Sequence, residues 1–229
     1  MTQRPVFVPM LEGNLLVREI SVAFEWHSGF AASQKQKNVA ALHDAASALG
    51  LSGVLEVSTK SDVPLGVALS AFNLHVGIAP NRTAPVENAY QASKVFEGGG
   101  PFTDLYAVSP RDAKRDERLS ASGTLIRFQF GGKDFPLQPL TAFYDWLYLR
   151  ALVRDSSMIS ALQSYAGFTD IEFNPAKSFN CQARACAAAV ALSERGELRA
   201  CAKSFSLFVS KLRRAESSSI PETVLELPL

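Results

Sequence analysis

Two stretches of the chain alternate apolar and polar residues, which is the pattern of a strand with one buried face. Every second side chain is apolar in residues 19–26, and the alternation returns in residues 125–130. Gly131 and Gly132 follow, so we expect the chain to turn back as a hairpin into residues 135–137. Two shorter apolar runs complete the predicted strands, residues 54–59 and 169–173.

Apolar residues at helical spacing predict most of the other elements. The expected helices cover residues 34–49, 86–96, 141–150, 157–166, 182–195 and 203–214. Ser33 is the expected N-cap of the first helix and Gly50 its stop, while residues 76–85, rich in Gly, Pro and Asn, are expected to form a loop. The pattern indicates a helix-rich α+β fold with a small antiparallel sheet, as one domain over residues 1–214 with a C-terminal tail, residues 215–229.

The helix predicted over residues 86–96 carries three different reactive groups on one side. At about 100° per residue, Glu87, Gln91 and Lys94 fall within roughly one sixth of its circumference. An acid, an amide and an amine therefore share one face. The alternative is an ordinary surface helix whose charged residues are only solvated.

The charge balance of the chain limits its partners. Lys and Arg number 23 and Asp and Glu 22, so the chain lacks the overall basic field of a non-specific nucleic-acid binder. Any contact with nucleic acid must then be local. No apolar run approaches the about 20 residues that cross a bilayer, and residues 1–5 lack a signal-peptide core, so we expect no membrane contact and a cytoplasmic location.

Cysteine and histidine give no sign of a metal site. The chain has three of each, without the spacing of metal ligands, and Cys181 and Cys186 do not form a CxxC motif. We therefore expect reduced and at least partly buried cysteines, no structural zinc and no cofactor.

Several polar residues are candidates for a ligand site. Lys35 and Lys37 lie at the start of a predicted helix, where the helix dipole favours anions, so a ligand phosphate would resolve the mismatch. The alternative is a solvated first turn. Ser70 and Asn73 interrupt an apolar run, and a ligand is one possible partner for such buried polar groups.

A glycine-rich turn and an aromatic helix add further candidates. Residues 98–100 are all glycine, which lets backbone approach a ligand closely, although the segment is neither a Walker loop nor a Rossmann fingerprint. Asp145 and Trp146 place a carboxylate beside an indole, which suits a ribose hydroxyl and a stacked base. The alternative is that this aromatic helix belongs to the core.

The helix motif at Val86–Lys94, together with the segment Leu69–Asn73, resembles the NADAR family, whose members are associated with NAD and ADP-ribose metabolism. The family pairs a Leu-Ser-Asn-Phe-like segment with a Val-Glu-His-Tyr-Tyr-Gln-Ala-x-Lys-like helix. Glu87, Tyr90, Gln91 and Lys94 match the second motif in order and spacing, whereas Ala71 stands where the first motif has Asn.

Further stretches resemble the NADAR branch encoded beside DarT-type DNA ADP-ribosylating toxins. They are residues 24–30, 33–37, 93–101, 142–148 and 170–175. The resemblance implies an antitoxin that removes ADP-ribose from guanine bases of single-stranded DNA, with a DarT-type toxin as a possible further partner.

The chemistry of that bond suits the motif. ADP-ribose joined to the guanine amino group is a glycosylamine, and its cleavage builds positive charge at the anomeric carbon, which the Glu87 carboxylate can stabilise. Alternatively the ring opens to an imine and a lysine amine, Lys94 or Lys60, exchanges with the guanine amine to give a Schiff base. A lysine nucleophile needs a lowered pKa, which Glu87 would oppose, so Lys94 has the alternative role of orienting Glu87 or binding a hydroxyl.

The remaining site residues are expected to bind the ligand: Ser70 and Asn73 the ribose or diphosphate, the glycine amides the phosphates, and Trp146 or Phe72 a base. The full candidate set is Lys35, Ser70, Phe72, Asn73, Tyr90, Gln91, Gly99, Gly100, Asp104, Asp145 and Trp146. Two other functions stay open. One is an N-glycosidase of a small ribosylated metabolite, and the other is an antitoxin without enzyme activity that covers its toxin through an exposed apolar patch.

Overall fold

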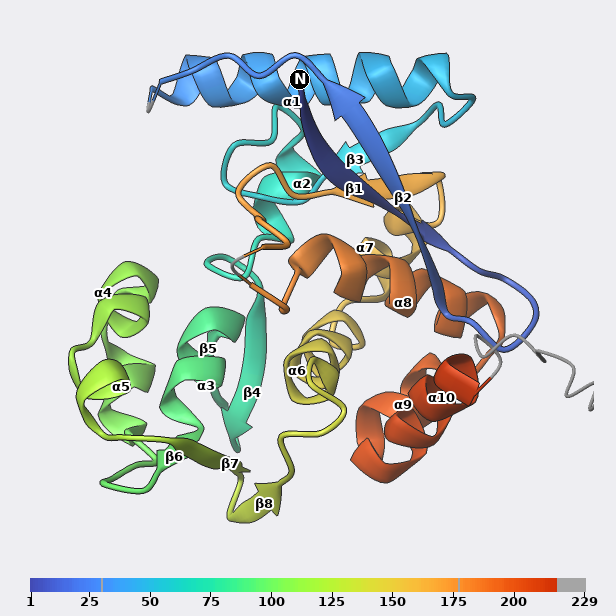
Figure 1. Cartoon of the computed structure of the whole chain (residues 1–229). Helices are drawn as coiled ribbons and strands as arrows, with labels where there is room; N and C mark the ends of the chain where they lie inside the picture. Colours follow the sequence, from blue (N-terminus) through green and yellow to red (C-terminus); the bar gives the residue numbers. More distant parts are fainter. Residues whose placement is uncertain (30, 177, 218–229) are drawn as a thin grey trace, which may run out of the picture.

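The computed structural model describes residues 1–29, 31–176 and 178–217 (Figure 1). Its helices and small sheets confirm the α+β class predicted from the sequence. Most of the predicted tail, residues 218–229, lies outside the described residues.

A four-stranded sheet in the order β2-β1-β9-β3 lies beneath α1 (Ala32–Ala48) (Figure 1). Its strands are β1 (Thr2–Pro9), β2 (Val17–Phe24), β3 (Val54–Glu56) and β9 (Gly167–Thr169). β1 and β2 form a long antiparallel hairpin, but β3 and β9 run parallel, so this sheet is mixed rather than wholly antiparallel. Val39 and Leu42 of α1 pack on Val22 and Phe24 of β2 in one buried cluster, as the alternation in residues 19–26 predicted.

The larger core surrounds α6 (Ala142–Leu152), which is buried along nearly its whole length. The alanines of α8 (Gln182–Glu194) pack against α6 from one side. A three-stranded antiparallel sheet, with strands β6 (Lys94–Phe96), β7 (Leu125–Phe130) and β8 (Lys133–Phe135), confirms the predicted hairpin. The Phe143 ring of α6 stacks on Phe128 of β7 with their centroids 4.4 Å apart. The aromatic helix is therefore core.

Short helices fill the rest of the described chain. They are α2 (Pro64–Ala68), α3 (Val86–Ala92), a 3-10 helix η1 (Thr103–Ala107), α4 (Pro110–Arg115), α5 (Arg118–Ala121), α7 (Ser156–Leu162), α9 (Leu198–Lys203) and α10 (Phe205–Ser217). In Figure 1, α3, α4 and α5 stand on one side of α6, and α9 and α10 on the other.

Residues 76–85 form a hairpin, so the predicted loop is wrong. β4 (His75–Ala79) pairs with β5 (Arg82–Pro85), and Asn81 adopts a left-handed φ of +56° in the turn between them. Val76 and Ala84 face each other in this register and both are buried. The strands are too short and too poor in apolar side chains for alternation to distinguish them from a loop.

Several element boundaries also differ from the prediction. The helix predicted to residue 96 ends at Ala92, and Lys94 begins β6. Ser33 lies within α1, whose N-cap is Ala31. The predicted last helix, residues 203–214, corresponds to α10, which begins at Phe205 after the extended backbone of Ser204, whereas α9 was not predicted. β1 was not predicted, since its buried residues form a continuous run between prolines rather than an alternating one.

The three cysteines are free and buried, as predicted. Among the residues that the structure describes, no helix has both the length and the apolar character needed to cross a membrane.

We predict that Gly66→Ala destabilises the protein. Gly66 lies in α2, and an added Cβ would overlap the carbonyl oxygen of Glu56 and the Oγ of Ser61. Helix propensity alone would favour alanine by about 1 kcal/mol, whereas forcing an atom into a packed interior costs about 1–3 kcal/mol. Urea unfolding should give a lower midpoint for the variant. A higher midpoint would mean that the contact relaxes and that helix propensity dominates.

Candidate active site

The two motifs that carry the family resemblance meet at the first turn of α3. The N–H groups of Val86 and Glu87 donate to the carbonyl oxygens of Leu74 and Ala71, each at 2.9 Å. The first N–H groups of a helix have no partner within it, so these bonds satisfy them and dock α3 on the segment before β4. Gln182 at the start of α8 connects this helix to the same segment, because its Oε1 accepts the Ala71 N–H at 2.8 Å.

Glu87 and Gln91 lie one turn apart on α3 and are both buried, with 5% and 6% of their surface exposed. The Gln91 amide donates from Nε2 to Glu87 Oε1 at 2.8 Å, which orients the carboxylate. The ordinary surface helix considered above does not describe α3, because neither side chain is solvated.

Lys94 lies just beyond α3, at the start of β6. Gly100 packs on its backbone with φ of +94°, and an added Cβ there would overlap the Lys94 carbonyl oxygen. Lys94 Nζ lies 4.8 Å from the centre of the Tyr90 ring. Burial lowers the pKa of Lys94 below its ordinary 10.5; the charge of Glu87 opposes this shift, and the charge of Lys114 adds to it. The net effect favours a neutral amine.

Tyrosines line the same region. The Tyr90 hydroxyl accepts a hydrogen bond from Asn180 Nδ2 at 2.7 Å, and its ring meets Tyr144 edge-on with centroids 5.2 Å apart. Burial raises the pKa of Tyr90 to about 12, and the charge of Glu87 also raises it. The pKa of Tyr144 is raised first by burial and then by the charges of Glu87 and Asp170. Two carboxyl groups distant in the sequence therefore act on one ring.

Glu56 and Asp170 stand at the carboxyl ends of the parallel strands β3 and β9, and both are buried. Glu56 accepts three hydrogen bonds, from Ser58 Oγ at 2.6 Å, Thr169 Oγ1 at 2.8 Å and the Ile171 N–H at 2.9 Å. Asp170 accepts the Glu172 N–H at 3.0 Å. Burial, followed by the charge of Glu56, raises the pKa of Asp170 well above its ordinary 3.8. Burial also raises the pKa of Glu56, but Glu56 accepts more hydrogen bonds that favour its charged form, so the pKa of Asp170 is raised further and Asp170 keeps its proton to the higher pH.

A family model described as DarT1-associated NADAR antitoxin matches residues 2–221. The chain belongs to this family of antitoxins. The match covers nearly the whole chain and includes both motifs that meet at α3, so the predicted resemblance is confirmed. No curated protein matches the chain significantly.

Two lysines predicted for the site of this NADAR antitoxin have different surroundings. Lys35 of α1 forms an ion pair with Glu172 at 3.3 Å, and its Nζ lies 5.3 Å from the centre of the Trp26 ring. Lys60 lies in the turn after β3, where its backbone N–H donates to Ser58 Oγ at 3.1 Å. Neither contact brings these lysines to Glu87, although Lys35 approaches the Asp170 segment through Glu172.

The segment before β4 is held by its own polar side chains. Ser70 is buried and its Oγ accepts the Phe72 N–H at 3.2 Å. Asn73 is exposed and donates from Nδ2 to the Val67 carbonyl oxygen at 2.8 Å. Phe72 is half-buried, with the Lys114 Nζ 5.8 Å from its ring centre. Phe72 and Lys114 therefore lie at the edge of the region around Glu87 and Lys94.

The glycine-rich turn mainly serves the fold. The N–H of Gly98 donates to the Ser122 carbonyl oxygen at 2.9 Å, and that of Gly99 to the Phe96 carbonyl oxygen at 3.4 Å. Gly100 packs on Lys94, as described above. Asp104 is exposed and pairs with Arg118 at 2.6 Å. The structure thus gives each of these predicted ligand residues a contact within the protein.

Asp145 and Trp146 lie in the core rather than at a surface. Asp145 is fully buried, accepts the Thr141 hydroxyl at 3.0 Å and forms an ion pair with Arg184. The Trp146 indole donates from Nε1 to the Cys201 carbonyl oxygen at 3.1 Å and packs among phenylalanines. The core alternative considered from the sequence therefore describes this pair, and the predicted stacking on a base finds no support in this placement.

Sequence reasoning missed Glu56, Asp170, Asn180 and Gln182. Each lies far along the chain from Glu87, so no local spacing connects them. Asp170 does lie in a stretch that resembles the family, and a polar residue directly after a short buried strand was the available signal. The sequence does not reveal the parallel pairing of β3 and β9, which brings the buried carboxyl groups of Glu56 and Asp170 to neighbouring strand ends.

We predict that Asp170→Asn changes the stability of the protein more favourably at neutral pH than at low pH, compared with the wild type. A carboxyl group whose pKa is raised by folding contributes full stability below its unfolded pKa, and that contribution is lost as the pH rises through the folded pKa. Asparagine mimics the protonated acid and does not titrate. The free energy of unfolding of the variant should therefore increase relative to that of the wild type as the pH rises above about 4.

Urea midpoints measured from pH 4 to pH 8 test this. Glu19→Gln, an exposed change on β2, is the control and should leave the pH dependence unaltered. Parallel curves for Asp170→Asn and the wild type would contradict the assignment of the proton to Asp170.

Proposed function

We propose that this antitoxin hydrolyses the N-glycosidic bond between ADP-ribose and the guanine amino group in single-stranded DNA, and so reverses the modification made by a DarT-type toxin. One observation carries the proposal. The buried Glu87 and the half-buried Lys94 of the family motif lie in one region, where the pKa of the lysine is lowered although a carboxylate is near. Such a pairing is unusual for a structural lysine and suits a nucleophilic one.

Glu87 stabilises the positive charge that develops at the anomeric carbon and the guanine nitrogen as the ribose ring opens to the protonated imine. The hydrogen bond from Gln91 fixes the carboxylate in one orientation. Because the region is buried, a charge there acts through a lower dielectric than in water and is worth more. Glu87 also accepts and returns the protons that the amine exchange requires.

Lys94 supplies the amine. The glycosylamine opens so that the anomeric carbon is doubly bonded to the guanine nitrogen, and the neutral Lys94 amine adds to that carbon. A proton passes to the guanine nitrogen, which leaves with its electron pair as the free amino group. Water then adds to the Lys94 Schiff base, the carbon–nitrogen bond breaks, and ADP-ribose leaves as the aldehyde with the lysine amine restored.

The surroundings favour Lys94 over Lys60 as the nucleophile. The charges of both Glu87 and Lys114 act on the pKa of Lys94, whereas the contact of Lys60 is to Ser58 through its backbone. Lys114, beside Phe72, is a suitable cation for the diphosphate of ADP-ribose.

Glu87→Gln should lower the rate of ADP-ribose release by about 10²- to 10⁴-fold, the range for loss of a positioned acid–base group. The purified protein is incubated with a guanine-ADP-ribosylated oligonucleotide, free ADP-ribosyl-guanosine and an ADP-ribosylated protein, and released ADP-ribose is followed by mass spectrometry. Glu19→Gln serves as the matched control.

Release from the guanine adducts alone supports the proposal. Release only from another ribosylated metabolite would favour the small-molecule glycosidase. If a folded Glu87→Gln variant released ADP-ribose at the wild-type rate, the role of Glu87 would be excluded. Toxin neutralisation without any release would favour an antitoxin that acts by binding.

Lys94 should become covalently attached to the sugar when the reaction is run with cyanoborohydride, which reduces a Schiff base. Peptide mapping should place the adduct on Lys94, and Lys60→Arg should leave it unchanged. The release rate should also rise with pH and level off below pH 10.5, because only the neutral amine attacks and its pKa is lowered. An adduct on Lys60, or none with full activity in Lys94→Arg, would exclude this nucleophile.

A further inference from the structure

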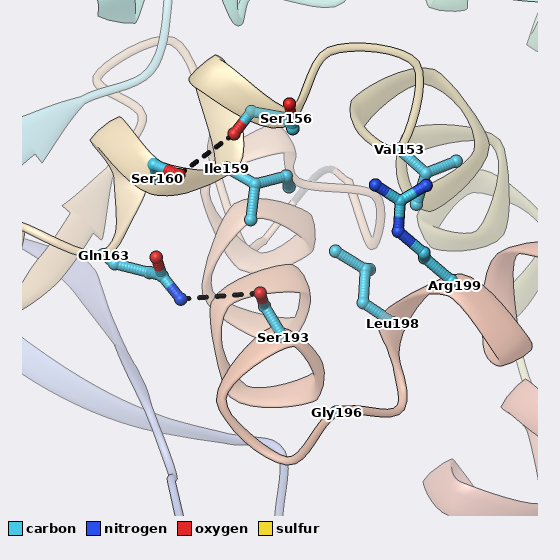
Figure 2. Close-up of a pocket in the computed structure, with 9 residues that line it drawn as sticks. All are labelled: Val153, Ser156, Ile159, Ser160, Gln163, Ser193, Gly196, Leu198 and Arg199. Atoms are coloured by element: carbon cyan, nitrogen blue, oxygen red, sulfur yellow. Dashed lines mark hydrogen bonds between the residues drawn. The ribbon is translucent and has the colours of Figure 1, made fainter.

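Three hollows adjoin one another on the face formed by the end of α6, by α9 and by the end of β4. Their volumes are about 700, 290 and 260 Å³. The first two share Gly77, Arg150, Arg154 and Lys203 in their walls, and the second and third share Val153 and Arg199. They therefore form one extended depression. Figure 2 shows the third hollow, with Arg199 and Val153 on one side and the serines of α7 and α8 across from them.

The walls of this depression carry five cationic side chains, which together define the basic groove. They are Lys133, Arg150, Arg154, Arg199 and Lys203. Within the described part of the chain, none of them forms an ion pair with a carboxylate, whereas cations such as Arg118 and Arg184 do. Asp134 also lines the groove but pairs with Arg127 at 3.3 Å. A chain with nearly balanced charge therefore concentrates uncompensated positive charge on one face.

One of these cations is packed against aromatic rings, and a second lies close to the backbone of β4. The Arg150 guanidinium carbon lies 4.8 Å from the centre of the Trp146 ring and 5.5 Å from that of Phe130, and its buried Nε has no hydrogen-bond partner among the described residues. Arg154 extends over Gly77, where an added Cβ would lie 3.1 Å from its Nη1. A guanidinium group that is packed like that of Arg150 loses little entropy when it binds an anion.

We propose that the basic groove binds the phosphate backbone of the single-stranded DNA that flanks the modified guanine. This inference rests on the proposed function, because it takes DNA as the substrate. One guanidinium group can donate two parallel hydrogen bonds to the oxygens of one phosphate. The hydroxyls of Ser204 and Ser206 line the same hollow and are further partners for phosphate or sugar.

The groove offers contacts to the backbone rather than to bases. Of its four aromatic rings, Phe130, Phe135 and Trp146 are buried, and the half-buried Phe205 packs edge-on against Phe135 and Trp146 with centroids 5.1 and 5.6 Å apart. Contacts to phosphates alone do not discriminate between DNA sequences. Such contacts suit an enzyme whose modified guanine occurs in different sequence contexts. An acidic protein segment is the competing ligand, but it would not need so many cations in one continuous row.

The basic groove and the region around Glu87 adjoin opposite ends of β4. The Leu74 carbonyl before β4 is bonded to the first turn of α3, while Gly77–Ala79 at the far end of the strand line the groove. Five residues of strand span about 13 Å, and stacked nucleotides are spaced by about 3.4 Å. In a stacked strand, a nucleotide at Glu87 and phosphates in the groove are therefore about four nucleotides apart, and a free nucleoside would not reach the groove.

The double variant Arg154→Gln/Lys203→Gln tests the proposal by fluorescence anisotropy with unmodified single-stranded DNA, at several salt concentrations. Both side chains are exposed, so the fold should be retained. Affinity should fall about tenfold, and the slope of log affinity against log salt should become shallower by about 1.4, since each lost phosphate contact contributes about 0.7. Arg18→Gln/Arg115→Gln, which removes two exposed charges elsewhere, is the matched control and should change neither quantity.

Activity measurements distinguish DNA binding in the groove from hydrolysis at Glu87 and Lys94. The double variant should raise KM for the ADP-ribosylated oligonucleotide while leaving release from ADP-ribosyl-guanosine at the wild-type rate. Unchanged affinity for DNA, or an equal loss in the control, would overturn the groove as a DNA site even if hydrolysis is confirmed. Loss of binding in a protein that hydrolyses neither substrate would support the groove and reject the enzyme.

Discussion

The site depends on the hydrogen bonds that dock the first turn of α3. The N–H groups of Val86 and Glu87 reach the carbonyl oxygens of Leu74 and Ala71, and Ala71 in turn reaches Gln182. These bonds use donors that a helix start leaves unsatisfied, so they cost the helix nothing and join three separate elements. Without them Glu87 would be a side chain on an isolated two-turn helix, which is too short to be stable alone.

Burial gives the docked residues their chemistry. Taking Lys94 out of water disfavours its charged form, while Gln91 keeps the Glu87 carboxylate in one orientation. Burial likewise raises the pKa of Asp170, and the neighbouring charge of Glu56 raises it further. Charged groups in an interior are a burden for stability, and their concentration in one region is typical of a place where function rather than folding selects the residues.

The two proposed parts of the protein divide the work of recognition. The region around α3 contains the buried Glu87 and the half-buried Lys94, whereas the basic groove is open and lined by cations that form no ion pair within the described part of the chain. A nearly neutral chain can therefore bind a polyanion locally. Strong non-specific binding over the whole surface would slow the search for a rare modified base, and a single basic face avoids it.

The sequence by itself determined the α+β class, the helix covering the first sheet, the hairpin of β7 and β8, and the motif that contains Glu87 and Lys94. Each of these follows from spacing within a short segment. Only the tertiary structure decided that Lys94 leaves the helix, that Trp146 is core, and that Asp170 and Gln182 join the site. These facts depend on the parallel pairing of β3 with β9 and on the docking of α8. Contacts between residues so distant in the chain leave no periodic trace in it.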